Sequence, residues 1–167
     1  MNWDAVGALA ETFGAIAVVS TIAYLAIQIR DSRRNAELTA VDTVMSGWNQ
    51  AIQALGESKE IASLIQRALA DYNELEQAEK FVFHTRMDAV INAYFKGSSY
   101  DDRGLWDLPS EIETAVLRLI LSPGGTQWWE GAGEVYPNRD KINQLLEAQR
   151  SELIPFSDTS FLSVERL

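Results

Sequence analysis

The sequence predicts an all-α protein, in which a single N-terminal transmembrane helix continues into a small helical bundle of about five further helices. No stretch alternates apolar and polar residues with the period of two that is typical of a strand. Apolar residues instead recur at steps of three and four, between helix start and stop signals. We expect a transmembrane anchor at 1–34, a helical bundle domain at 35–154 and a loosely ordered tail at 155–167.

The anchor is predicted from an apolar run between Phe13 and Ile29 that contains no charged residue. A helix of this length rises about 25 Å, near the lower limit for a bilayer core of roughly 30 Å. The leader before it is acidic, whereas a cleaved signal peptide has a positive leader. We favour a membrane span. The alternative is a helix buried at the centre of a soluble bundle, because such a helix is also apolar on every side.

Three arginines predict the orientation of this helix. Arg30, Arg33 and Arg34 follow the apolar run directly, and no Lys or Arg precedes it. By the positive-inside rule, the N-terminus lies outside and the C-terminal domain lies in the cytoplasm.

A stripe of small and polar residues runs along the same helix at alternating steps of three and four. Its members are Trp3, Gly7, Ala10, Gly14, Ala17, Thr21, Tyr24 and Gln28. In lipid, helices associate through small residues that permit close approach and through polar residues that hydrogen-bond across the contact. We interpret Gly7, Ala10, Gly14, Ala17, Thr21 and Gln28 as a helix-association seam. The alternative is that Gly and Ala are simply common in membrane helices.

The first helix is expected to continue beyond the anchor, because no Gly or Pro occurs between Ala15 and Ser46. Gly56 is expected to end it. Its inward face is predicted to be Leu38, Val41, Met45, Trp48, Ile52 and Leu55.

The next two helices are predicted from their caps. Ser58 is expected to cap a helix with the apolar stripe Ile61, Leu64, Ile65, Ala68, Leu69 and Tyr72. Asn73 and Glu76 have the spacing of a capping box for a third helix that ends at Gly97. Its inward face is predicted to be Phe83, Met87, Val90, Ile91 and Tyr94.

After a polar loop at 98–109, Ser110 and Glu113 predict another capped helix. The segment "SPGG" then breaks the chain, with Ser122 as the N-cap and Pro123 at the first helical position of a short helix. A last helix follows Pro137, with Ile142, Leu145 and Leu146 on its inner face. We expect four tryptophans to be core residues: Trp48, Trp106, Trp128 and Trp129.

Composition excludes several kinds of chemistry. The absence of cysteine rules out disulfides, iron–sulfur clusters and thiol catalysis. Residues 1–34 are neutral overall, so residues 35–167 carry the whole net charge of -10, which disfavours nucleic-acid binding. We predict no metal and no cofactor, because zinc-protease, P-loop and hydrolase motifs are missing.

Two candidate chemical sites remain, and each has a structural alternative. His84, the single histidine, lies four residues before Asp88, a spacing that suits a catalytic pair or an ordinary hydrogen bond. The glycines of "SPGG" could bind an anion through their N–H groups, but no Lys or Arg accompanies them. We therefore favour a helix–helix corner, and we predict no catalytic residue.

The segments "MNWDAVGALAETFGAIAVVSTIAYLAIQIRDSRRNAE" and "LSPGGTQWWE" resemble a group of small bacterial proteins without an established activity. These proteins have one N-terminal hydrophobic helix and a helical domain with an SPGG-x-x-WW-like corner. The resemblance implies a bacterial source and a membrane anchor, and it supplies no active-site residues.

We therefore expect a non-enzymatic, single-pass protein of the bacterial inner (cytoplasmic) membrane that binds another protein or stabilises a complex. Its expected partners are the lipid bilayer and either further copies of itself or another membrane protein. Two other hypotheses stay open. One is a soluble all-α module that holds an apolar ligand among its Trp and Phe side chains, and the other is an enzyme that uses His84 and Asp88.

Overall fold

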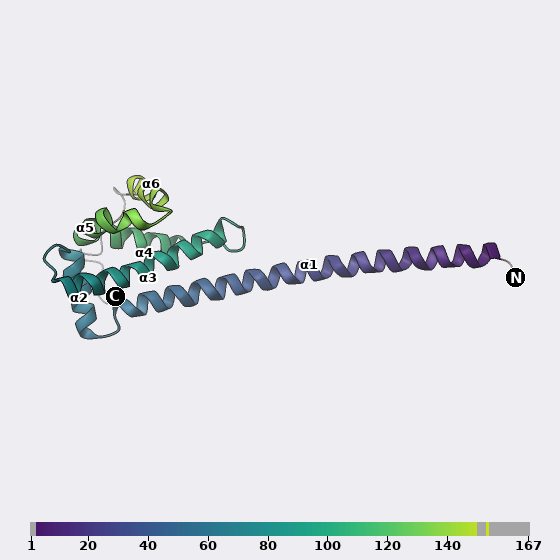
Figure 1. Ribbon diagram of the computed structural model, residues 1–167, viewed down its shortest axis with the longest axis horizontal. Coiled ribbons are helices and arrows are strands. Elements are labelled where there is room, and N and C mark those ends of the chain that lie inside the picture. The colour runs from purple at the N-terminus through teal and green to yellow at the C-terminus, as the bar shows by residue number, and fades with distance from the viewer. Residues whose placement is uncertain (1–2, 150–152, 154–167) are drawn as a thin grey trace, which may run out of the picture. The chain divides into compact units, whose positions relative to one another are not determined.

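The computed structural model describes residues 3–149 and Leu153, and every regular element in this part of the chain is helical. This confirms the all-α prediction. The elements are α1 (Trp3–Leu55), α2 (Lys59–Ala70), α3 (Gln77–Asp101), α4 (Ser110–Leu121), α5 (Pro123–Ala132), the short 3₁₀-helix η1 (Gly133–Val135) and α6 (Arg139–Gln149) (Figure 1). The predicted tail at 155–167 lies outside the described residues.

The chain divides into two compact units, Met1–Val41 and Asp42–Leu167. The expected boundary between the anchor and the bundle domain was at residue 34. The first unit consists of the N-terminal part of α1, and the second contains the last turns of α1 together with α2 to α6. α1 is uninterrupted and ends just before Gly56, as the distribution of Gly and Pro predicts.

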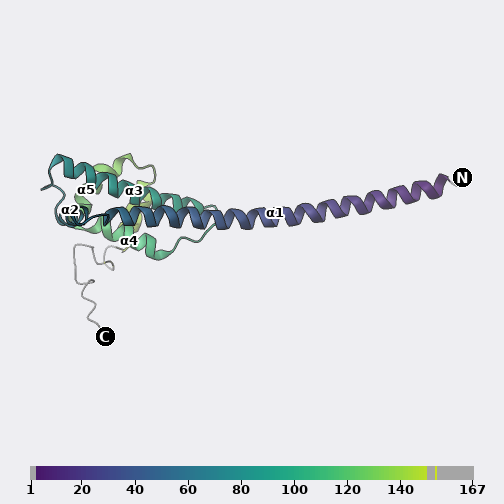
Figure 2. The ribbon, with the colours of Figure 1, turned by 90° about the horizontal axis from the view of Figure 1, so that it is seen from below.

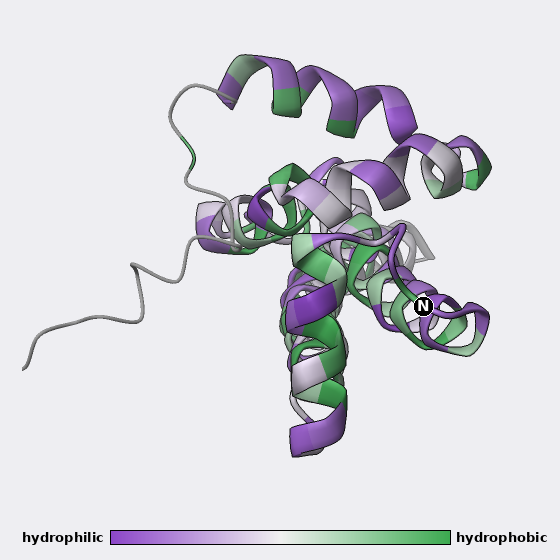
Figure 3. Cartoon of the chain, turned by 90° about the vertical axis from the view of Figure 1, so that its left-hand side faces the viewer, coloured by the Kyte–Doolittle hydropathy of each residue, from purple (hydrophilic) through white to green (hydrophobic). Residues whose placement is uncertain are grey.

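The core of the second unit is built around α3. The predicted inward face of this helix is confirmed, because its members are at most 1% exposed: Phe83, Met87, Val90, Ile91 and Tyr94. α2 contributes the predicted Leu64, Ile65, Ala68 and Leu69. Figure 2 shows α2, α3, α4 and α5 gathered with the last turns of α1. The domain helices carry both hydrophobic and hydrophilic sides in Figure 3, as expected for helices that bury one face.

The predicted packing face of α1 is correct in part, because Met45, Trp48 and Leu55 pack against the core. Leu38 and Ile52 are 61% and 37% exposed, whereas Val44 and Ala51 are buried. Val44 fits here because Gly97 of α3 has no side chain: a Cβ atom on Gly97 would lie 3.2 Å from Cγ1 of Val44. Val44 and Ala51 therefore take part in this contact, and the predicted Leu38 and Ile52 do not.

The same glycine explains why the predicted end of α3 is wrong. The helix passes through Gly97 and ends at Asp101, so the loop begins four residues later than expected. A Cβ atom on Gly97 would lie 2.9 Å from Cδ1 of Leu108 and 3.3 Å from Cζ3 of Trp106. Gly97 therefore serves close packing inside a helix, and it does not terminate the helix.

Of the predicted side-chain caps, Ser58 is confirmed, since its hydroxyl accepts a hydrogen bond of 3.2 Å from the Ile61 N–H. The predicted box at Asn73 and Glu76 is wrong by three residues. α3 begins at Gln77, and the Glu76 N–H donates to Glu79 at 3.2 Å.

The Asn73 N–H has other partners, because it donates to the side chains of Asp71 and Gln127. The box at Ser110 and Glu113 is also wrong. Ser110 is the first residue of α4, and the carboxylate of Glu113 accepts from the Tyr94 hydroxyl instead of capping the helix.

The "SPGG" segment is the predicted corner between α4 and α5. The Ser122 hydroxyl accepts from the Gly125 N–H at 3.0 Å and donates to the Leu119 carbonyl at 2.7 Å. Pro123 is the first residue of α5. Because the Gly125 N–H is already bonded to Ser122, the structure favours the corner over an anion site.

The four tryptophans that were predicted to be core residues pack in the core. Trp128 and Trp129 are buried, and Trp48 and Trp106 are half-buried against the core. On α6, Ile142 is fully buried, and Leu145 and Leu146 pack against the core as expected.

Candidate functional site

The apolar run on α1 is exposed along its whole length. Its large side chains are between 48% (Leu25) and 70% (Ile29) exposed. The others in this range are Phe13, Ile16, Val18, Val19, Ile22, Tyr24 and Ile27. Soluble monomers rarely expose a continuous apolar surface of this size.

Within the described residues, α1 therefore supplies one helix, near the N-terminus, that is long and apolar enough to span a membrane, and none of its apolar stretch is buried. The alternative in which this segment forms the centre of a soluble bundle required a buried helix. In the described part of the chain, no other segment buries this helix.

Polar side chains within the run form hydrogen bonds inside their own helix. The Thr21 hydroxyl donates to the Ala17 carbonyl at 2.8 Å, and the Gln28 amide donates to the Tyr24 hydroxyl at 2.9 Å. A polar group that finds its partner one turn away needs no water to satisfy it. These bonds lower the cost of placing the side chains of Thr21, Tyr24 and Gln28 in an apolar environment.

The predicted association seam lies on an open part of α1. Gly7, Gly14, Ala17, Thr21 and Gln28 are all exposed, and a Cβ atom on either glycine would meet nothing within 4 Å. Ala10 lies on α1 as well, but its side chain is outside the described part. The exposed backbone at both glycines leaves room for the close approach of a second helix.

The three arginines are exposed immediately after the apolar run. Arg33 forms an ion pair with Glu37 one turn later, with 3.1 Å between Nε and Oε1. In the described part of the chain, neither Arg30 nor Arg34 has an ion-pair partner. Two of the three guanidinium groups are therefore available to a partner outside the chain.

His84 and Asp88 each bond to an aromatic side chain. Nε1 of Trp128 donates to Nδ1 of His84 at 3.1 Å, and the Tyr136 hydroxyl donates to Asp88 at 2.6 Å. The accepting nitrogen of the imidazole is thus occupied by an indole, and the carboxylate by a phenol. This arrangement matches the structural alternative for the pair, in which it joins α3 to α5 and the segment after η1.

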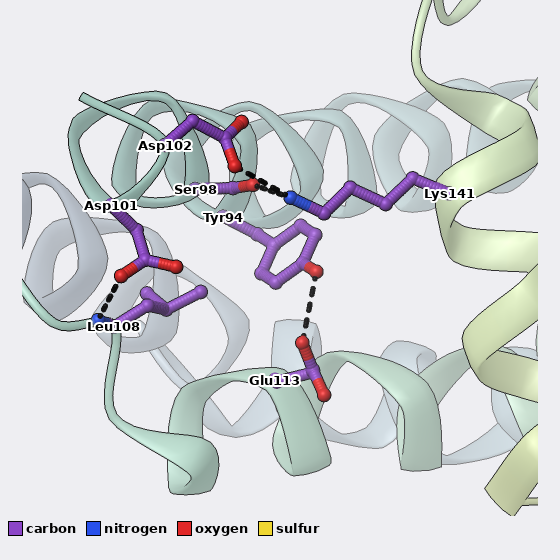
Figure 4. A network of polar contacts seen from close by, with 7 residues as sticks. All are labelled: Tyr94, Ser98, Asp101, Asp102, Leu108, Glu113 and Lys141. Atoms are coloured by element: carbon purple, nitrogen blue, oxygen red, sulfur yellow. Dashed lines mark hydrogen bonds and ion pairs between the residues drawn. The ribbon is translucent and has the colours of Figure 1, made fainter. Parts of the chain in front are cut away.

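A serine–lysine contact was missed from the sequence. Nζ of Lys141 on α6 donates to Oγ of Ser98 on α3 at 2.7 Å and to Asp102, the residue directly after α3, at 3.3 Å (Figure 4). Serine beside lysine can act in nucleophilic catalysis if the amine is uncharged and can take the serine proton. Here Nζ also donates to the carboxylate of Asp102, and Ser98 is only 4% exposed. The contact fastens α6 to α3.

Two tyrosines form further hydrogen bonds that involve α3. The Tyr94 hydroxyl donates to Glu113 on α4 at 3.3 Å (Figure 4). Burial, followed by the charge of Glu113, raises the pKa of Tyr94 above its ordinary value. Burial and the hydrogen bond to Asp88 raise the pKa of Tyr136 in the same way. Both phenols therefore stay protonated and hold helices together.

The hollows of the domain do not favour the apolar-ligand hypothesis. The cavity beside Trp129 has a volume of about 110 Å³, whereas ligand pockets usually measure roughly 300–1,000 Å³. Two larger grooves, of about 410 and 530 Å³, are lined by residues of α1 and α3 and of the turn after α1, and neither lining includes the Trp or Phe side chains that this hypothesis requires. Within the described residues, no group of three or more acidic or histidine side chains could hold a metal ion.

The polar pairs of the domain thus join helices to one another, and the apolar run of α1 is exposed within the described part of the chain. No protein-family model matches the chain, and neither a curated protein nor a solved structure matches it.

Proposed function

We propose that this is a single-pass membrane protein, in which α1 anchors an acidic helical domain to the cytoplasmic membrane of a bacterium. The observation that carries this proposal is the complete exposure of the apolar run between Phe13 and Ile29. Covering its nine large side chains is worth on the order of 10 kcal/mol. That is comparable to the whole folding stability of a typical domain, so this surface demands an apolar environment.

The arginines support an orientation with the N-terminus outside and the bundle domain in the cytoplasm. Moving the three guanidinium groups of Arg30, Arg33 and Arg34 through hydrocarbon is costly, whereas the N-terminal flank carries no Lys or Arg. The acidic domain that follows stays with the arginines on the inner side.

The role that fits this arrangement is to bind another protein or to stabilise a membrane complex. The His84 and Ser98 contacts join helices to one another, which supports a binding role over a catalytic one. The open seam with Gly7 and Gly14 supports assembly through α1, either with a second copy or with another membrane protein.

Fractionation tests the anchor directly. The full chain should sediment with membranes, resist extraction by salt and alkaline carbonate, and dissolve in detergent. A chain that starts at Asn35 should stay in the supernatant with a helical circular dichroism spectrum. A full chain that remains soluble and monodisperse without detergent would contradict the proposal.

The orientation can be tested by labelling, because the chain contains no native cysteine. A cysteine introduced at Asn2 should react with an impermeant maleimide in intact cells. One introduced at Asp107, an exposed loop position, should react only after the membrane is opened. The reverse pattern would overturn the proposed orientation.

A further inference from the structure

The arginines at the end of the apolar run lie on one side of α1. Arg30 and Arg34 are one turn apart, and Arg33 lies on the adjoining part of the same side, within an arc of about 100°. All three are exposed, and Arg30 directly follows Ile29, the most exposed large side chain of the run. Cationic side chains at this position would lie at the depth of lipid headgroups if the apolar run spans a bilayer.

These three guanidinium groups are not equivalent. Arg33 is held by Glu37, whereas Arg30 and Arg34 have no ion-pair partner in the described part of the chain. A guanidinium group can donate two parallel hydrogen bonds to the oxygens of a phosphate group. Arg30 and Arg34 therefore present two free phosphate-binding groups on successive turns.

We propose that Arg30 and Arg34 bind the headgroups of anionic phospholipids, and that the ion pair with Glu37 limits the contribution of Arg33. This inference rests on the proposed membrane anchor, because the apolar run must place the arginines at the bilayer surface. The ligand is a phosphodiester that carries a net negative charge, such as phosphatidylglycerol, as opposed to a zwitterionic lipid such as phosphatidylcholine.

The test uses the full chain in mixed micelles with equal amounts of phosphatidylglycerol and phosphatidylcholine. Native mass spectrometry measures the ratio of the two lipids that stay bound. The wild-type chain should retain an excess of phosphatidylglycerol. R30Q/R34Q should reduce this excess about tenfold or more, because each basic residue near an anionic surface contributes several-fold to binding.

Two further variants test whether Arg33 contributes less to lipid binding than Arg30 and Arg34 do. R33Q should change the ratio less than R30Q or R34Q does, since Arg33 is already paired. E37Q should increase the excess of phosphatidylglycerol because it releases Arg33. Equal effects of R30Q, R33Q and R34Q, or no effect of E37Q, would overturn the proposed role of the ion pair.

K59Q/R103Q is the matched control, because it removes two exposed positive charges from the second unit. It should leave the lipid ratio unchanged. An equal loss in this control, or no loss in R30Q/R34Q, would overturn the proposal. Millimolar inorganic phosphate should not displace the lipid. Displacement would mean that free phosphate, and not the headgroup, is the ligand.

A flotation assay separates this inference from the proposed function. The full chain and all variants should float with vesicles of pure phosphatidylcholine if α1 is an anchor. Flotation without a preference for phosphatidylglycerol would reject headgroup binding and leave the anchor standing. A failure to float with either vesicle would reject the anchor itself.

Discussion

Gly124 of α5 lies so close to the backbone of Ala68 in α2 that a Cβ atom on Gly124 would overlap the Ala68 carbonyl oxygen. The obstacle is backbone, so it cannot move aside as a flexible side chain could. The corner after Ser122 therefore docks α5 onto α2 only if this position has no side chain.

Gly124→Ala should lower the free energy of unfolding by about 3 kcal/mol or more, at the upper end of overpacking effects. Urea unfolding of the chain that starts at Asn35 measures this change. Gly131→Ala is the matched control on the same helix, because a Cβ atom there meets nothing within 4 Å. It should be neutral or stabilise by about 0.5–1 kcal/mol, since alanine is the better helix former. Similar effects of the two substitutions would contradict the steric argument.

His84→Ala should destabilise the domain. The substitution leaves Nε1 of Trp128 without its acceptor in a side chain that is only 1% exposed. An unsatisfied buried donor costs about 1–3 kcal/mol. His84→Gln, which keeps an acceptor, should restore part of this loss. A melting temperature unchanged by His84→Ala would contradict the structural role of this hydrogen bond.

The domain should lose stability in alkali through its buried phenols. The folded state raises the pKa of Tyr136 above the ordinary value of 10, so the folded protein holds this proton more tightly than the unfolded chain does. The resulting stability is fully present below pH 10 and is lost as the pH rises above it. In Tyr136→Phe, the free energy of unfolding should therefore fall less steeply with pH above 10. Urea titrations at several pH values measure the slope, and an unchanged slope would refute the assignment.

Gly14→Ile should weaken self-association of α1 in a membrane two-hybrid or cross-linking assay. A branched side chain at this position prevents the close approach of a second helix. Ala23→Ile is the control, because residue 23 lies on the side of α1 opposite the seam. It should associate like the wild type. If both variants associate normally, the seam is not an interface.

The sequence alone predicted a helix cap correctly where no distant side chain binds the capping residue. Ser58 and Ser122 are caps because each hydroxyl accepts a hydrogen bond from an N–H group in the first turn of its helix. The boxes at Asn73 and Glu113 failed because Asp71 and Gln127 bind the first, and Tyr94 donates to the second. The sequence predicts a helix stop at Gly97, because it does not reveal the side chains that pack against this residue. Its role depends on Trp106 and Leu108, which return to it through a loop.

The features of the candidate site also differ in whether the local sequence could predict them. The apolar run and the arginines are consecutive in sequence, so composition was enough to find them. The contact between Ser98 and Lys141 joins residues 43 positions apart, and neither position carries a local pattern. The partners of His84 and Asp88 also come from distant segments. Such contacts depend on how the helices pack.

The hydrogen bonds of Thr21 and Gln28 bear on how the protein is made. Both side chains find their partners within α1, so these bonds can form as soon as the nascent segment becomes helical. In the membrane anchor that we propose, these side chains need no second helix to satisfy them. Insertion of the proposed anchor and its association with a second helix would then be separate steps.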